Sequence, residues 1–196
     1  GIDYRPKDGK LYAVGLQANL YTLNTNNGEA IFLRKLITDP SDTTDGNASF
    51  TQIMGDANLI TVNFNPAADR LRVISNTGQN LRINVDTGAT ITDGTINLAT
   101  GSAAVVAGAY TNAFAGTGST KLYSLDQNSD SIYLQNANAG TLGNSTALGA
   151  DINTNGGGGF DIDPVSNVGF AALKLASGNY KFFKLQFFRF IGSPLV

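Results

Sequence analysis

The sequence predicts an all-β fold, a small β-propeller of four four-stranded blades. Three observations lead to this prediction. Residues 61–88 form a unit in which short alternating strands are joined by tight turns. Similar units recur at irregular intervals of roughly 40 to 60 residues, the range in which one repeat corresponds to one propeller blade. The 23 glycines of the chain supply residues for the turns.

The clearest unit contains three expected strands. Val62 and Phe64 alternate with asparagines in the first strand, which runs into a polar turn. Residues 71–74 form the second strand and residues 81–85 the third, which stops before Gly88. Because tight turns join these strands, they are expected to pair as an antiparallel meander.

The other units are read in the same way. Residues 2–24 hold the first copy, residues 109–135 a looser third copy, and residues 159–185 the fourth. Residues 30–36 are expected to add an outer strand to the first copy, and the small residues at 102–108 suit a closely packed inner strand. We therefore expect one propeller domain with blades at about residues 1–58, 59–102, 103–152 and 153–196.

Composition narrows the classes of partner. With 196 residues and 42% hydrophobic content, the chain can bury one core, which predicts a single domain. The net charge is −2 and no basic run is present, so no nucleic acid partner is expected. No apolar run approaches the roughly 20 residues of a membrane span. The low charge content and the start at Gly1 predict a secreted or cell-surface protein, although the absence of Cys says little about compartment.

The sequence lacks the residues of several common active sites. It contains no His and no Cys, which excludes Ser-His-Asp and Cys-His catalysis and removes the usual zinc ligand sets. A Gly-x-Ser-x-Gly nucleophile motif is also missing. The question of enzymatic activity stays open, with a non-enzymatic role favoured.

Oxygen ligands offer the remaining chemistry. Asp3, Asn63 and Asp161 occupy the same place in three repeats, so they are expected on one ring around the propeller axis, which Ala109 of the third repeat interrupts. Such a ring could bind calcium and polarise a substrate. The alternative is structural, with each side chain bonded to backbone amides of its own or the next blade. The structural interpretation is favoured.

Two other groups of carboxylates are candidates. Asp161 and Asp163 are expected on the same side of one strand, as a pair for acid and base chemistry or as an ordinary strand end. Asp39, Asp42 and Asp45 lie in one polar loop and could bind calcium, but their spacing does not fit the helix-loop-helix calcium motif. A solvated loop is the favoured interpretation there.

Four short sequence motifs indicate a family resemblance. They are GIDYRP at residues 1–6, NFNPAADRLRV at 63–73, TGQNLR at 77–82 and AYTN at 109–112. Together they resemble a bacterial family catalogued as domain-of-unknown-function family four-three-nine-four, common in secreted proteins of cyanobacteria and other bacteria. The resemblance extends to about residue 172 and implies a small secreted propeller-like domain. It carries no established activity, substrate or catalytic residue.

The resemblance also bears on the two ends of the chain. Family members usually have further strands before the position of Gly1, which leaves open a fifth blade in the full-length family. Their last strands also differ from the aromatic-rich stretch that runs from Phe182 to Phe190. We therefore expect the edges from Gly1 to Arg5 and from Phe182 to Phe190 to contact other polypeptide, either a second copy or another protein.

Three functions remain after these exclusions. The first is a secreted or cell-surface propeller that is not an enzyme and has a binding, structural or assembly role. The second is a calcium-dependent hydrolase with Asp3, Asn63 and Asp161 as metal ligands. The third is a glycan-binding, lectin-like propeller, because tyrosines recur at strand positions where they could stack on sugars. No cofactor other than calcium is expected.

Overall fold

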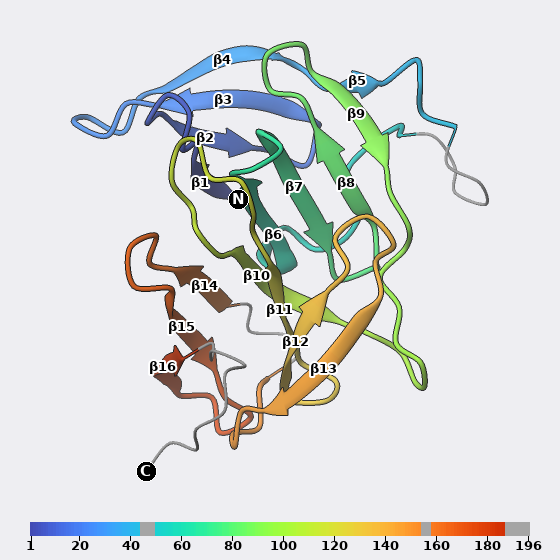
Figure 1. Cartoon of the computed structure of the whole chain (residues 1–196), viewed down its shortest axis with the longest axis vertical. Coiled ribbons are helices and arrows are strands. Elements are labelled where there is room, and N and C mark those ends of the chain that lie inside the picture. The colour runs from blue at the N-terminus through green and yellow to red at the C-terminus, as the bar shows by residue number, and fades with distance from the viewer. Residues whose placement is uncertain (44–49, 154–157, 187–196) are drawn as a thin grey trace.

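The computed structural model describes residues 1–43, 50–153 and 158–186. Its strands form four sheets around a common centre, and this arrangement confirms the predicted four-bladed β-propeller (Figure 1). One short 3-10 helix, Ala57–Leu59, precedes the second sheet. No helix among these residues is long and apolar enough to cross a membrane.

The first two sheets follow the predicted meander. Blade 1 consists of β1 (Ile2–Tyr4), β2 (Leu11–Val14), β3 (Asn19–Leu23) and β4 (Ala30–Lys35), paired in that order. Blade 2 consists of β6 (Ile60–Asn65), β7 (Arg70–Ser75), β8 (Asn80–Ile83) and β9 (Ala89–Thr92). A fifth strand, β5 (Ile37–Thr38), pairs in parallel with β9, so a segment that follows blade 1 completes the outer edge of blade 2.

The last two sheets continue the ring. Blade 3 consists of β10 (Val105–Tyr110), β11 (Leu122–Asp126), β12 (Ser131–Gln135) and β13 (Leu142–Ala147). Blade 4 has three strands among the described residues, β14 (Gly158–Ile162), β15 (Val168–Lys174) and β16 (Tyr180–Gln186). The remainder of the expected aromatic strand pair, residues 187–190, lies outside the described part of the chain.

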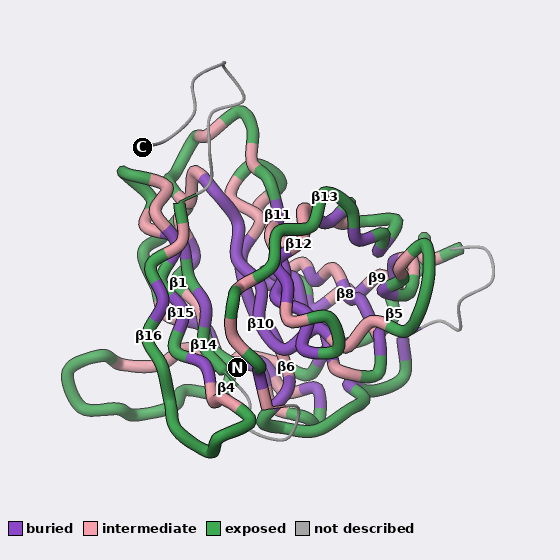
Figure 2. Tube along the Cα trace, turned by 90° about the horizontal axis from the view of Figure 1, so that it is seen from below, coloured by how far each residue is buried: buried purple, intermediate pink, exposed green. Residues whose placement is uncertain are grey.

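One strand differs from its sequence prediction. The third copy was expected to begin at residue 109, after a run of small residues at 102–108 that suits an inner strand, whereas β10 begins at Val105 inside that run and ends at Tyr110. Asn112 has a left-handed φ of 54°, which an extended strand does not allow. The early start agrees with the close packing expected for the small residues, since every residue of β10 is buried (Figure 2).

Three hydrophobic clusters join the blades in pairs. One contains Tyr12 and Leu20 of blade 1 with Phe64 and Leu71 of blade 2. A second joins blade 2 to blade 3, and a third joins blade 3 to blade 4. Strand alternation explains this arrangement, because successive side chains of a strand point to opposite neighbours. Blades 2 and 3 are therefore covered on both sides.

A stability prediction follows from Gly88, which connects β8 to β9. Its φ is 83°, and an added Cβ would lie 2.9 Å from the Lys35 carbonyl oxygen. Replacement by valine is expected to lower the free energy of unfolding by about 1 kcal/mol or more, because a β-branched residue disfavours this backbone and meets a fixed carbonyl. Chemical denaturation measures the change. Gly118→Val is a milder control, since its Cβ would meet nothing within 4 Å and no positive φ is recorded there.

Candidate functional site

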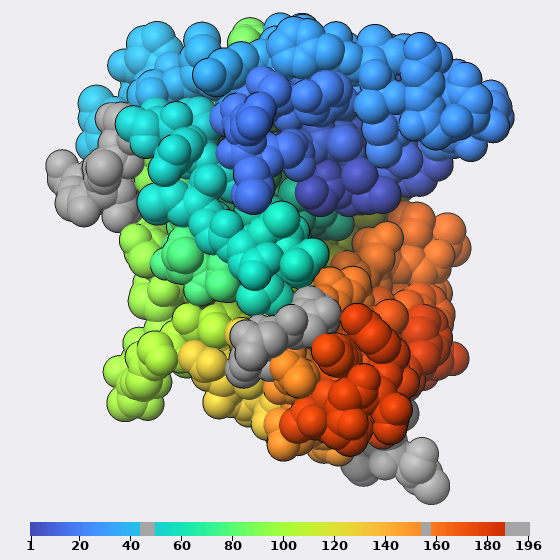
Figure 3. All heavy atoms as spheres, turned by 180° about the vertical axis from the view of Figure 1, so that it is seen from behind, coloured from blue at the N-terminus to red at the C-terminus, as the bar shows by residue number. Residues whose placement is uncertain are grey.

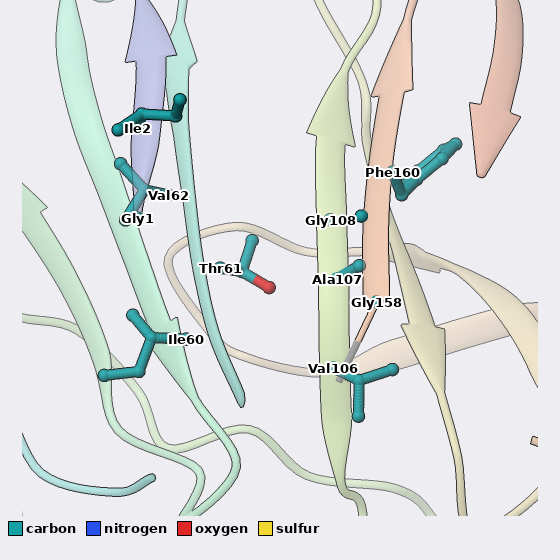
Figure 4. A pocket seen from close by; sticks show the side chains of 11 residues that line it. Gly1, Ile2, Ile60, Thr61, Val62, Val106, Ala107, Gly108, Gly158 and Phe160 are labelled. Carbon is teal, nitrogen blue, oxygen red and sulfur yellow. The ribbon is translucent and has the colours of Figure 1, made fainter. Parts of the chain in front are cut away.

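The four inner strands enclose a cavity at the propeller centre. β1, β6, β10 and β14 each contribute residues near their first positions to a space of about 240 Å³ (Figure 4). Its walls are mostly apolar side chains and glycine backbone, including Ile2, Val62 and Gly108. These residues line the cavity because the first strand of each blade begins close to the propeller axis.

One polar side chain lines this cavity. Thr61 is 4% exposed, and its Oγ1 has no hydrogen-bond partner in the structure. Figure 4 shows Thr61 lying between β6 and β10. An added Cβ on Gly108 would lie 3.3 Å from the Thr61 Cγ2, so a larger residue there would crowd this side chain.

Asp3 and Asn63 make equivalent bonds between blades. The Asp3 Oδ2 accepts a hydrogen bond from the Phe64 backbone N–H at 2.6 Å, which joins blade 1 to blade 2. The Asn63 Oδ1 accepts one from the Tyr110 backbone N–H at 2.9 Å, which joins blade 2 to blade 3. Each side chain therefore connects its own inner strand to the inner strand of the next blade. The structural interpretation of Asp3 and Asn63 predicts bonds of this kind, from each side chain to a backbone amide of the next blade.

The third and fourth blades do not repeat this bond. Ala109 has no side-chain acceptor, as the sequence indicates. Asp161 accepts a hydrogen bond through its Oδ1 from the N–H of Ile162, the next residue of its own strand, at 2.8 Å. Asp163 accepts bonds from the backbone N–H and the hydroxyl of Ser166, and so closes the turn that follows β14.

Burial changes the titration of the two inner-strand aspartates. Desolvation raises the pKa of Asp3 to about 7, the bond from Phe64 opposes this, and the negative charge of Asp161 adds to it. Desolvation also raises the pKa of Asp161, while its bond from Ile162 opposes the rise. The effect of the Asp161 charge on the pKa of Asp3 indicates that the two carboxylates lie near each other, close to the axis. A buried acid near neutrality is a feature of functional sites, but structural networks produce it as well.

The oxygens of the predicted calcium ring are directed at backbone groups. Asp3, Asn63 and Asp161 each accept a backbone N–H, which leaves fewer lone pairs for a cation that takes six to eight oxygen ligands. Within the described residues, no group of three or more acidic side chains is placed to hold a metal ion. In the polar loop, Asp39 bonds Ser41 and Asp42 accepts the Thr92 N–H, whereas Asp45 lies outside the described residues. Calcium binding stays a prediction.

Two buried arginines connect the blades and were not recognised from the sequence. Arg72 is 2% exposed, and its Nη1 donates to the Asp93 Oδ2 at 2.6 Å. The same guanidinium reaches two groups of blade 3, the Asn138 amide oxygen at 2.9 Å and the Tyr110 hydroxyl at 3.3 Å. A buried charge needs this number of partners to offset its loss of hydration.

Arg5 forms the corresponding connection between blades 1 and 2. Its guanidinium binds the Asp69 carboxylate with two bonds of 2.7 and 2.6 Å, and the Asp86 carboxylate with two bonds of 2.7 and 2.8 Å. These bonds lower the pKa of Asp69 and of Asp86 and raise that of Arg5. Of the edge expected to contact other polypeptide, Arg5 is thus already engaged inside the domain.

The side of blade 1 that points away from blade 2 is apolar and exposed. In the strand register, Ile2, Ala13, Tyr21 and Phe32 form one row across the sheet. Ile2 and Phe32 are 58% and 56% exposed, and the rings of Tyr21 and Phe32 pack edge to face at 5.7 Å. A second row holds Tyr4, Leu11 and Leu23. We call the seven residues of these rows the blade 1 face.

The side of blade 4 that points away from blade 3 has the same character. Phe170 and Phe182 stack at 5.8 Å, and Tyr180 and Phe182 are 68% and 67% exposed. The alternate residues of these strands, such as Ala171 and Phe183, pack into the cluster with blade 3. We call Phe170, Ala172, Tyr180 and Phe182 the blade 4 face. None of the three hydrophobic clusters of the described residues includes residues of both blade 1 and blade 4.

A comparison with protein families identifies the family of this chain. A family model described as a domain of unknown function, DUF4394, matches residues 1–187. The chain belongs to the DUF4394 family. This confirms the resemblance seen in the sequence, and the match extends beyond residue 172 into the aromatic-rich stretch. A search of curated protein sequences finds no relative of this DUF4394 chain.

A search of solved structures gives matches of low identity. The β-propeller domain of Cps50 (Swd1) from Myceliophthora thermophila has 13% identity and a TM-score of 0.49, over 95% of this chain and 53% of that chain. A chain of a mitotic checkpoint complex has 15% identity and a TM-score of 0.47, over 94% and 48%. The dihydro-heme d1 dehydrogenase NirN has 9% identity and a TM-score of 0.44, over 92% and 35%. This chain therefore spans about half or less of the structures that it matches.

Proposed function

We propose that this DUF4394 domain is a non-enzymatic module with a binding or assembly role, acting at the cell surface or outside the cell. The observation that carries the proposal is the pair of exposed apolar surfaces, the blade 1 face and the blade 4 face. Contiguous exposed apolar patches are typical of interaction sites, since a soluble domain otherwise keeps such surface small. Figure 3 shows the first sheet, in blue, above the fourth, in orange and red, on the same molecule.

The non-enzymatic part of the proposal is supported by the residues available. The sequence has neither His nor Cys, and the acidic side chains nearest the axis bond backbone N–H groups. We expect no turnover of lactones, phosphoesters or glycosides by the purified protein. A rate above background that is lost in Asp161→Ala, with Asp163→Ala as a neighbouring control, would show that the domain is an enzyme.

The location of the protein outside the cell is supported by composition alone. Only 14% of the residues are charged, and amides, hydroxyls and glycine supply most of the polar surface. Fractionation of the source cells, with an antibody against the folded domain, tests this part separately. Recovery of the protein only from the interior of the cell would contradict it.

Glycan binding is a second candidate, favoured by the exposed tyrosines. Tyr4 is 54% exposed and Tyr180 is 68% exposed, and an aromatic ring with a polar tip suits a wet binding surface. A glycan array measures this function. Specific binding that falls in Tyr4→Ala and Tyr180→Ala, but not in Val165→Ala, would favour a lectin over an assembly module.

Calcium binding by the domain is tested by elemental analysis. Protein purified without chelator should be analysed by mass spectrometry and titrated with calcium. Stoichiometric calcium that disappears in the Asp3→Ala and Asp161→Ala variants would support the predicted metal site. Because the side chains in question already accept backbone N–H groups, we expect none to be retained.

A further inference from the structure

The two exposed faces are the two halves of one kind of interface. Each sheet has two sides. In blades 1, 2 and 3, one side packs against the blade that follows in the sequence. The corresponding side of blade 4 is the blade 4 face. In blades 2, 3 and 4, the opposite side packs against the preceding blade, and the corresponding side of blade 1 is the blade 1 face. One chain therefore carries both halves of an interface that it forms three times internally.

We propose that the partner at these surfaces is a second copy of this chain, with the blade 4 face of each copy packed against the blade 1 face of the other. This inference rests on the proposed assembly function and names its partner. A two-fold axis allows both pairs of faces to be covered at once, and such closed dimers are the commonest protein oligomers. In such a pair, both the blade 1 face and the blade 4 face of each copy are covered.

The chemistry of the two faces suits this contact. The blade 1 face has no charged residue in either row, so covering it removes apolar surface from water without desolvating a charge. On blade 4, three charged residues share the side of the aromatic group, because Lys184 and Asp161 pair with Phe170 and Lys174 pairs with Tyr180. Three of the seven residues of the blade 1 face and three of the four residues of the blade 4 face are aromatic, a residue class that is enriched in protein interfaces.

A polar group at the inner edge of blade 4 fits the same contact. Asp161 occupies the position from which Asp3 and Asn63 reach the backbone N–H of the next inner strand. Its Oδ1 instead accepts the N–H of its own neighbour, Ile162. A following blade would give this carboxylate the same kind of partner that the inner strands of blades 2 and 3 give to Asp3 and Asn63. Both Asp161 and the blade 4 face would therefore be satisfied by a blade packed against this side of blade 4.

Sedimentation equilibrium of residues 1–196 over a range of concentrations tests the proposal. The wild type is expected to form a two-copy species. Phe182→Lys on the blade 4 face and Phe32→Lys on the blade 1 face should each weaken the association by roughly tenfold or more, because each buries a charge in both contacts. Val165→Lys is the matched control, since Val165 is 91% exposed in a turn away from both faces. Circular dichroism establishes that each variant is folded.

Mixing the two variants gives the sharpest outcome. In a mixed pair, the intact blade 4 face of Phe32→Lys meets the intact blade 1 face of Phe182→Lys, so one contact has no lysine while the other has both. Because that one contact keeps its full strength, whereas both contacts are weakened in each variant alone, the mixture is expected to associate more tightly than either variant. A wild type that stays monomeric, or association unaffected by either variant, would overturn the second copy as partner. Open-ended assemblies would overturn the two-fold arrangement. None of these results bears on turnover, which tests the proposed function separately.

Discussion

Replacement of Arg72 by methionine is expected to lower the free energy of unfolding by about 3 kcal/mol, because it leaves buried partners without their cation. Asp93 would keep its bonds to Arg82, but the Asn80 and Asn138 amide oxygens would lose their donor. For a domain of this size the thermal midpoint should fall by roughly 6 to 12 °C. Calorimetry or thermal circular dichroism measures the shift.

Arg70→Met is the control for this variant. Arg70 lies on the same strand as Arg72, but within the described residues its guanidinium donates to the backbone oxygens of Ala68 and Asp69. The control should change stability by about 0.5 kcal/mol or less, as partly exposed positions usually do. Equal losses in the two variants would show that Arg72 contributes through its hydrocarbon stem and not through its buried charge.

Replacement of Asp3 by asparagine is expected to stabilise the protein at pH 8. The folded pKa of Asp3 is about 7 against an ordinary value of 3.8, so burying the charged form has a cost above neutrality. An amide oxygen at this position can still accept the Phe64 N–H, as Asn63 accepts that of Tyr110. The gain in the free energy of unfolding should be a few kcal/mol, measured by urea denaturation.

The pH dependence gives the sign of this effect. Between about pH 4 and pH 7 the folded state holds a proton on Asp3 that the unfolded state has lost, so wild-type stability falls as the pH rises through this window. The difference between Asp3→Asn and the wild type should therefore be large at pH 8 and small at pH 4. Asn63→Asp is the reciprocal control, because it places a carboxylate at a buried site and should destabilise more at pH 8 than at pH 4. A pH-independent difference for Asp3→Asn would contradict the raised pKa.

The meander was predictable because each signal is local in the sequence. Val62 and Phe64 alternate with polar residues and do face the core with blade 1, and Gly78 and Gly88 mark turns that have positive φ. The start of β10 was harder to place, because a run of small residues has no alternation to mark its face. Local patterns therefore defined hairpins better than they defined an inner strand that is buried on every side.

The candidate site was only partly predictable, because its partners come from other blades. The repeat placed Asp3 and Asn63 in equivalent positions, but their partners are backbone N–H groups that leave no mark in the sequence. Nothing in the local sequence marks Arg72 as buried. Its burial depends on Asp93 and Asn138, which lie 21 and 66 residues further along the chain. Only the assembled propeller brings these groups together.

The short strand β5 has a consequence for the order in which the domain unfolds. Its pairing with β9 joins segments about 50 residues apart, so blade 2 cannot lose its outer strand without disturbing the chain that leaves blade 1. Arg5 and the shared hydrophobic cluster act across the same boundary. Blades 1 and 2 should therefore open as one cooperative unit, and amide hydrogens of β6 to β8 should exchange last. In blade 4, by contrast, the strand contacts are local hairpins, and exchange should begin there.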